Sequence, residues 1–427
     1  MNNSLIKSEL IHKEYILNEH PSGLKILLYP MKGFSSNYAI FGTKYGSVDN
    51  AYIDADGGKV DLPEGIAHFL EHKLFESEDG DAFTKYAKTG AYSNAYTSFD
   101  RTCYLFSCSN RFYDNLKILL DFVRSPFFTE ATVNKEQGII GQEIRMYDDM
   151  PGWRVMFNML EGMFHNHPVR IDIAGTVESI AKITDKTLYD CYNRFYDLSN
   201  MFIVLAGDFN ADEVLDFIYK NLKTSKDSVK ASSTLPDEPP EVKEHFVSCN
   251  LDVSKPLFCL GFKEGSETPS LKQTVAVEIL LKMLAGSASD LYKELLDEGL
   301  INEEFSFEYF NGRGFALPLF EGESDNPKVV MDKILSKVEN YKENGLDEKL
   351  FGAVRRDLYG RSLRRFDAAE SVCSMLTDAT VLGYNLFEYF EILSTITPEE
   401  VASALSVFSK DNAVLSVVNP IAKGEAK

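Results

Sequence analysis

The sequence lacks the features of disulfide-stabilised, membrane-spanning and nucleic-acid-binding proteins. Its six cysteines are scattered without a C-x-x-C pair, which argues against a thiolate metal site or a disulfide framework. There is no run of about 18 apolar residues, so the sequence predicts no transmembrane helix. The 44 basic residues are outnumbered by 65 acidic ones, which gives a formal charge of −21. This charge argues against nucleic acid as a partner, because phosphates require a basic surplus to neutralise them.

The beginning of the chain also does not resemble a signal peptide. The first 20 residues are polar and have no apolar core of the kind found in a signal peptide. We therefore expect a cytoplasmic protein. The acidic surplus is compatible with cationic peptide substrates, although solubility alone is a sufficient reason for it.

The length of the chain predicts more than one domain. With 427 residues, it exceeds the size at which a single core keeps growing. Each half begins with strand signals, continues with helical ones and returns to a strand near its end. Residues 226–241 are rich in Ser, Asp, Glu and Pro and suggest a linker. We predict two similar α+β domains, an N-terminal one over 1–225 and a C-terminal one over 242–427.

The segment 63–76, PEGIAHFLEHKLFE, carries most of the chemical information. It contains two of only seven histidines, and His68, Glu71 and His72 form an H-x-x-E-H pattern. Side chains four residues apart lie on one face of an α-helix, so the two histidines can bind a single ion. A proline and a glutamate suit the first turn, and apolar residues on several sides predict a buried helix.

This pattern suits a hydrolytic zinc site. Such a site has three protein ligands and an open position for water, so two imidazoles need a third ligand from elsewhere, usually a carboxylate. Glu71 would be the general base that takes a proton from a water whose pKa the ion has lowered. The pattern is the inverted form of H-E-x-x-H. The alternative is a buried helix whose two histidines and glutamate are merely hydrogen-bonded.

Two further segments offer partners for this helix. Residues 129–147 predict a helix in which Glu136 and Glu143, seven residues apart, lie on nearly the same face. Taken alone, these carboxylates are expected on a solvated helix face. Residues 91–97 and 102–107 predict paired strands, and the motif helix is expected to pack on their sheet.

Together, these segments resemble the pitrilysin or insulinase-type zinc peptidases, peptidase family M16, and in particular its short two-domain members such as the bacterial YmfH group. In that family, H-x-x-E-H is followed by a glutamate ligand, which another glutamate precedes by seven residues. The resemblance implies that His68, His72 and Glu143 bind Zn²⁺, that Glu71 is the base and that Glu136 orients the site. It also implies that each domain is a mostly antiparallel sheet packed with helices.

Other stretches resemble the same family. Residues 92–98, which include Asn94 and Ala95, resemble its active-site edge strand, to which an extended peptide adds as a further strand. The sequence Ala-Gly-Thr at 174–176 resembles a later landmark of its N-terminal domain.

The C-terminal half departs from the family pattern. Active members carry an arginine and a tyrosine that contact substrate or the developing oxyanion, and Leu296 and Asn302 stand in the matching segment here. Family precedent pairs a metal-bearing subunit with a paralogue that supplies these two residues. The resemblance therefore implies a zinc-dependent endopeptidase that hydrolyses peptides as one subunit of a heterodimer. A non-catalytic binding or assembly subunit, and a protease that matures a ribosomally made peptide, are the alternatives.

Overall fold

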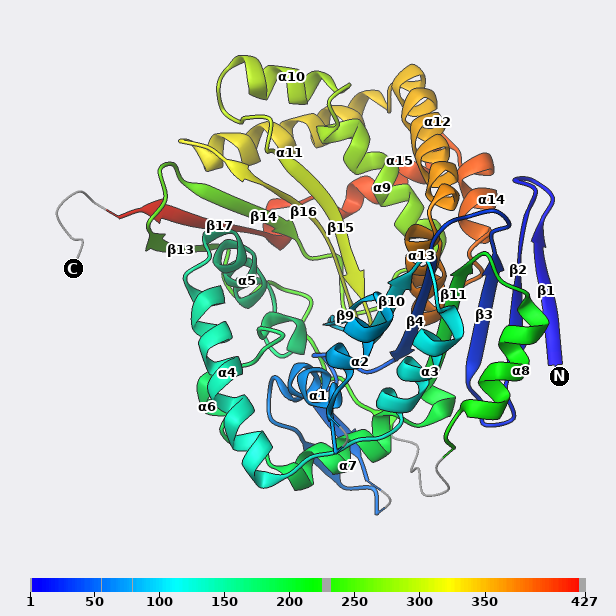
Figure 1. Ribbon diagram of the computed structural model, residues 1–427. Coiled ribbons are helices and arrows are strands. Elements are labelled where there is room, and N and C mark those ends of the chain that lie inside the picture. The colour runs from blue at the N-terminus through cyan, green and yellow to red at the C-terminus, as the bar shows by residue number, and fades with distance from the viewer. Residues whose placement is uncertain (1, 55, 79, 225–231, 422–427) are drawn as a thin grey trace. The chain divides into compact units, whose positions relative to one another are not determined.

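The computed structural model describes residues 2–54, 56–78, 80–224 and 232–421 (Figure 1). The chain forms two compact units, each assembled from more than one stretch of sequence. Unit 1 comprises Met1–Ile144, Asp172–Leu235 and Ser362–Phe387. Unit 2 comprises Arg145–Ile171, Pro236–Arg361 and Glu388–Lys427.

Unit 1 is built on a seven-stranded sheet with the order β1-β2-β3-β11-β4-β10-β9. Strand β11 runs parallel to β3, and every other neighbouring pair is antiparallel. The central strand β11 is buried along its whole length, as its continuous apolar sequence MFIVLAG requires. The strands are β1 (Asn2–Ser8), β2 (Lys13–Glu19), β3 (Lys25–Pro30), β4 (Asn37–Thr43), β9 (Tyr92–Thr97), β10 (Thr102–Cys108) and β11 (Met201–Gly207).

Unit 2 contains a five-stranded sheet with the order β13-β17-β14-β16-β15. Its β13 is parallel to β17 and the other pairs are antiparallel, which repeats the directions of β3-β11-β4-β10-β9 in unit 1. This shared topology confirms the prediction of two similar α+β folds. The strands are β13 (Phe246–Leu251), β14 (Leu257–Phe262), β15 (Ser306–Gly312), β16 (Phe315–Glu323) and β17 (Ala413–Pro420).

Helices cover both sheets. In unit 1, helices α1, α2 and α3 contact β9 or β10, and α9 contacts β15 at the corresponding place in unit 2. Among the described residues, no helix is long and apolar enough to cross a membrane. The longer helices are α1 (Ile66–Leu74), α2 (Ala82–Thr89), α3 (Phe112–Val123), α4 (Glu130–Asp148), α5 (Pro151–Met163), α7 (Asp185–Phe195), α8 (Ala211–Asn221), α9 (Leu271–Ala285), α10 (Asp290–Asp297), α11 (Pro327–Asn344), α12 (Glu348–Arg364), α13 (Ala369–Leu382) and α14 (Glu388–Thr395).

Each unit also includes a helix from the other half of the sequence. Helix α5 (Pro151–Met163) packs on β13, β14 and β17 of unit 2, whereas α13 (Ala369–Leu382) packs on β4 and β11 of unit 1 (Figure 1). The compact units therefore differ from the contiguous domains that we predicted at 1–225 and 242–427. The reason is that α5 and α13 bury their apolar faces on the sheet built by the other half of the sequence.

Parts of the predicted linker contact the rest of the chain where the structure describes it. Residues 226–231 of this segment lie outside the described residues. Farther along, β12 (Ser232–Ser233) pairs with β5 (Ala51–Ile53). The buried carboxylate of Glu238 pairs with Lys263 at 2.6 Å and accepts the backbone N–H groups of residues 165–167.

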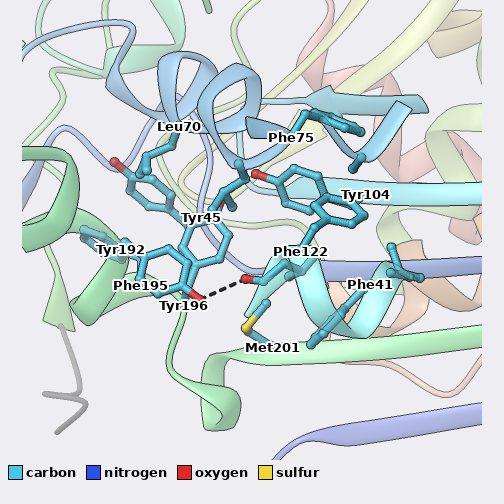
Figure 2. Packing of buried hydrophobic residues seen from close by; sticks show 14 of the residues in the cluster. Phe41, Tyr45, Leu70, Phe75, Tyr104, Phe122, Tyr192, Phe195, Tyr196 and Met201 are labelled. Carbon is cyan, nitrogen blue, oxygen red and sulfur yellow. Dashed lines mark hydrogen bonds between the residues drawn. The ribbon is translucent and has the colours of Figure 1, made fainter. Parts of the chain in front are cut away.

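Aromatic side chains gather in the part of the unit 1 core next to α1 (Figure 2). Tyr45 stacks on Phe195 with ring centroids 4.0 Å apart. The hydroxyls of Tyr104 and Tyr196 share a hydrogen bond of 2.8 Å, which satisfies both groups away from water. Phe75, directly after α1, packs against Tyr104 and so fixes the end of this helix over the sheet.

Candidate metal centre

Helix α1 confirms the buried helix predicted from the motif. Eight of its nine residues are buried, His72 being the exception. The helix begins after Gly65, whose φ of 86° is a left-handed conformation that favours glycine. A side chain at Gly65 would collide with the backbone of Ala174, so residues 174–176 determine where α1 begins.

Three side chains converge beside α1 although one of them is distant in sequence. Nε2 of His68 lies 3.8 Å from one carboxylate oxygen of Glu143, and Nε2 of His72 lies 3.5 Å from the other. One ligand atom from each of the three residues can be chosen so that all lie within 4.8 Å of one another. Glu143 comes from α4, which brings its carboxylate to the two imidazoles.

The geometry of this group fits a zinc ion. Ligands at about 2.0–2.1 Å from a tetrahedral zinc are separated from each other by about 3.3 Å, close to the observed 3.5 and 3.8 Å. Two imidazole nitrogens and one carboxylate are also a donor set that zinc uses in hydrolytic sites. The residues present can therefore hold zinc and leave a fourth position open.

Glu136 contacts the same group from the other side of His72. Its Oε1 lies 3.0 Å from Nδ1 of His72, and its side chain is buried. The hydrogen bond favours the tautomer with a proton on Nδ1 and leaves Nε2 available for an ion. As their seven-residue spacing predicted, Glu136 and Glu143 face α1 from one side of α4.

Burial and charge affect the two imidazoles differently. Burial, with a smaller contribution from the neighbouring His72, lowers the pKa of His68 to about 3, so this ring is neutral and able to bind a metal. Burial also acts to lower the pKa of His72. The hydrogen bond to Glu136 and the carboxylates of Glu71 and Glu143 outweigh this effect and raise the pKa of His72 above its ordinary value.

Glu71 lies next to the histidines and is held by a residue that sequence reasoning missed. The hydroxyl of Thr97 donates a hydrogen bond of 3.0 Å to Oε2 of Glu71. Burial raises the pKa of Glu71 above its ordinary value, although His72 and the Thr97 hydrogen bond oppose this shift. Thr97 ends β9 two residues after Ala95, so both side chains lie on the same face of the strand. This periodicity was the signal that could have placed Thr97 on the face toward α1.

Strand β9 borders this site and confirms the edge strand expected from the sequence. It ends the sheet order of unit 1 and pairs only with β10 among the described strands. Asn94 and Ala95 lie in the middle of β9 and border a cavity of about 250 Å³. The cavity is lined by Glu71, His72, Phe75, Glu76, Asp81, Phe83, Asn94, Ala95 and Glu136.

Leu296 and Asn302, the two residues that depart from the family pattern, lie in unit 2. Leu296, on α10, is partly exposed. The amide of Asn302 donates a hydrogen bond of 2.9 Å to Glu323. Neither side chain carries the positive charge or the phenolic hydroxyl that stabilises an oxyanion.

Models of known families match two successive regions of the chain. Residues 59–177 match Insulinase (Peptidase family M16), and residues 182–358 match the Peptidase M16 inactive domain. The first region contains all of the residues that converge beside α1. Together, the fold and the histidine and glutamate group define a metallopeptidase type of architecture.

Relatives identify the family. The chain is 39% identical over 409 residues to the uncharacterized zinc protease YmfH of Bacillus subtilis (strain 168), which covers 94% of this chain and 95% of that protein. The crystal structure of an M16-like peptidase from Alicyclobacillus acidocaldarius superposes with a TM-score of 0.92 at 36% identity and covers 99% of both chains. Pitrilysin shares the fold, with a TM-score of 0.78 at 17% identity over 98% of this chain and 46% of its own. This protein belongs to peptidase family M16.

Proposed function

We propose that this chain is a zinc-dependent metalloendopeptidase that hydrolyses peptides as the metal-bearing subunit of a heterodimer. The observation that carries the proposal is the convergence of His68, His72 and Glu143 at distances suited to one zinc ion, with Glu71 and Thr97 beside them. Membership of family M16 and the naming of the YmfH relative as a zinc protease support it.

The ligands would be the two Nε2 atoms of His68 and His72 and the carboxylate of Glu143. When bound there, zinc supplies Lewis acidity, which polarises a peptide carbonyl and lowers the pKa of a water. Glu136 keeps the imidazole of His72 in the orientation and tautomer that present Nε2 to this position.

Glu71 would transfer the proton. Its buried carboxyl has a raised pKa, which makes it a stronger base than an exposed glutamate. It would accept the proton of the attacking water and deliver it to the leaving amine. Thr97 holds the carboxyl in place by donating to Oε2, so the base does not need to reorient during the transfer.

Strand β9 would align the substrate. An extended peptide can pair with the open edge of β9 at Asn94 and Ala95 through main-chain hydrogen bonds, which do not depend on the peptide sequence. Because these residues and Glu71 line the same cavity, the paired peptide would bring a main-chain carbonyl next to the base.

The heterodimer follows from what unit 2 lacks. With Leu296 and Asn302 in place of a cation and a phenol, this chain does not supply that pair of oxyanion contacts itself. A paralogous subunit would provide them. A non-catalytic binding or assembly subunit, the alternative function, would not require an intact zinc site. Maturation of a ribosomally made peptide would use the same site on a particular substrate.

Zinc analysis combined with a peptidase assay tests the proposal. We expect about one zinc per chain, and peptide hydrolysis once the chain is combined with its paralogue. Glu71→Gln should retain zinc and lose about 10²–10⁴-fold in turnover, the usual contribution of a general base. Absence of zinc would favour the non-catalytic function, and unchanged turnover of the zinc-loaded variant would refute the role of Glu71. Full activity of the isolated chain would refute the heterodimer.

A further inference from the structure

The cavity beside the metal centre has an aromatic wall. Phe83, in the first turn of α2, stacks on the buried Phe75 with centroids 4.1 Å apart and planes at 11°. Phe83 nevertheless keeps 46% of its surface exposed. An accessible aromatic surface of this kind binds aliphatic side-chain stems and attracts cations to its face.

Acidic side chains from a small hairpin complete the lining of this cavity. Glu76 comes from β7 (Glu76–Ser77) and Asp81 from β8 (Gly80–Asp81). Glu76 forms an ion pair with Lys73, whose side chain is fully buried, so part of its charge is already compensated. Of the described residues that line the cavity, none is lysine or arginine.

Asp81 offers the less compensated charge. Its Oδ1 accepts the backbone N–H of Phe83 at 2.6 Å and so caps α2. Within the part of the chain that the structure describes, Asp81 forms no ion pair with a cationic side chain. The carboxylate is exposed, so a ligand can reach it without displacing another residue.

The cavity also adjoins the proposed position of the scissile bond. Glu71 and His72 line it on the side of α1, and Asn94 and Ala95 line it on the side of β9. A peptide paired with β9 would therefore place a side chain next to the scissile bond within reach of the cavity. This step rests on the function proposed above.

We propose that the cavity selects a lysine or arginine side chain next to the scissile bond of the peptide. The stem would lie against the exposed surface of Phe83, and the cationic head would reach the carboxylates of Asp81 and Glu76. An aspartate or glutamate at the same position would be repelled by these carboxylates.

The binding test uses the Glu71→Gln protein, loaded with zinc and combined with its paralogue, so that peptides are not consumed. Two fluorescein-labelled peptides differ at one position, which is lysine in one and norleucine, its uncharged analogue, in the other. Fluorescence anisotropy should show about three- to ten-fold tighter binding of the lysine peptide, with a difference that shrinks at high salt.

A second substitution identifies the group responsible. Asp81→Asn should abolish most of the preference for lysine while keeping α2 capped, because asparagine caps helices as well as aspartate. Glu78→Gln makes the same change in net charge at an exposed site between β7 and β8 that does not line the cavity, and it should leave the preference intact. Equal binding of the two peptides, or equal effects of the two substitutions, would overturn the inference.

Cleavage of a random peptide library by the zinc-loaded wild-type heterodimer separates this inference from the proposed function. Enrichment of lysine or arginine beside the cleaved bond would support the inference. Cleavage without such enrichment would refute the selection of cations and leave the peptidase function standing. Absence of cleavage throughout the library would refute the peptidase function itself.

Discussion

Substitution of Gly175 by alanine should weaken zinc binding even though Gly175 is not a ligand. The residue has φ of +73°, and a Cβ there would lie 2.5 Å from the carbonyl oxygen of Glu64, just before α1. The left-handed conformation alone costs about 1–2 kcal/mol for alanine. Overpacking adds about 1–3 kcal/mol, which a shift of the beginning of α1 can relieve.

That shift would move the metal ligands on α1. If the shift of α1 relieves all of the overpacking energy, zinc binding must restore the original position at a cost of about 1–3 kcal/mol. Zinc affinity then falls by about 5- to 150-fold. Competition with a chromophoric chelator measures the affinity, and hydrogen exchange of residues 66–74 reports the accompanying loosening of the helix. We expect both readouts to change together.

Gly33 provides the matched control. Its φ is +83°, but a Cβ there would meet nothing within 4 Å. Gly33→Ala therefore carries the conformational cost without the collision and should leave zinc affinity unchanged. Equal zinc affinities for the two variants would refute the conclusion that contact with residues 174–176 positions α1.

Three further substitutions test other contacts. Glu136→Gln should reduce zinc affinity by about 10- to 100-fold, measured by chelator competition, because a ligand imidazole loses its charged hydrogen-bond acceptor. Glu238→Gln should destabilise unit 2 by about 3–5 kcal/mol, because Lys263 keeps a buried charge without its carboxylate partner. Urea unfolding, followed by the fluorescence of the single tryptophan in unit 2, measures this loss of stability. Tyr196→Phe should cost about 1–3 kcal/mol, measured by thermal unfolding, since the Tyr104 hydroxyl stays buried without its partner.

Each of these expectations has a result that contradicts it. For Tyr196→Phe, an unchanged midpoint of thermal unfolding would show that the hydrogen bond to Tyr104 does not stabilise the core. Unchanged zinc affinity in Glu136→Gln would show that His72 is oriented by other contacts.

Burial acts to raise the pKa of Glu238, but the hydrogen bonds from Lys263 and three backbone N–H groups lower it overall. Its stabilisation is therefore present above about pH 4.3 and lost as pH falls through the lower folded value. An acid-unfolding profile that Glu238→Gln leaves unchanged would contradict this assignment.

Local patterns were sufficient for much of the site. The four-residue spacing of His68 and His72 places both imidazoles on one face of any helix, and the seven-residue spacing of Glu136 and Glu143 does the same. The aromatic and β-branched residues of β9 and β10, with the turn region between the two runs, were enough to predict a strand pair. These features depend on neighbours in sequence, so a linear reading recovers them.

Other features depended on contacts that form only in the folded chain. Strand β1 was not predicted because its residues, NNSLIKS, are mostly polar, and it forms by pairing along its whole length with β2. The role of Thr97 was missed because a threonine at the end of a strand is common. Only its hydrogen bond of 3.0 Å to Glu71, formed in the folded chain, distinguishes it. The cavity likewise requires α1, α2, β9 and the 76–81 hairpin to be assembled.

The sequence by itself determined the chemistry available to this protein: two imidazoles on one helix face, a carboxylate between them and two more on another helix. Only the tertiary structure decided that α4 brings Glu143 to α1. It also decided that α5 and α13 each pack on the sheet built by the other half of the sequence. The physical reason is that periodicity determines which face of a helix is apolar, whereas the surface that covers this face is chosen by packing over the whole chain.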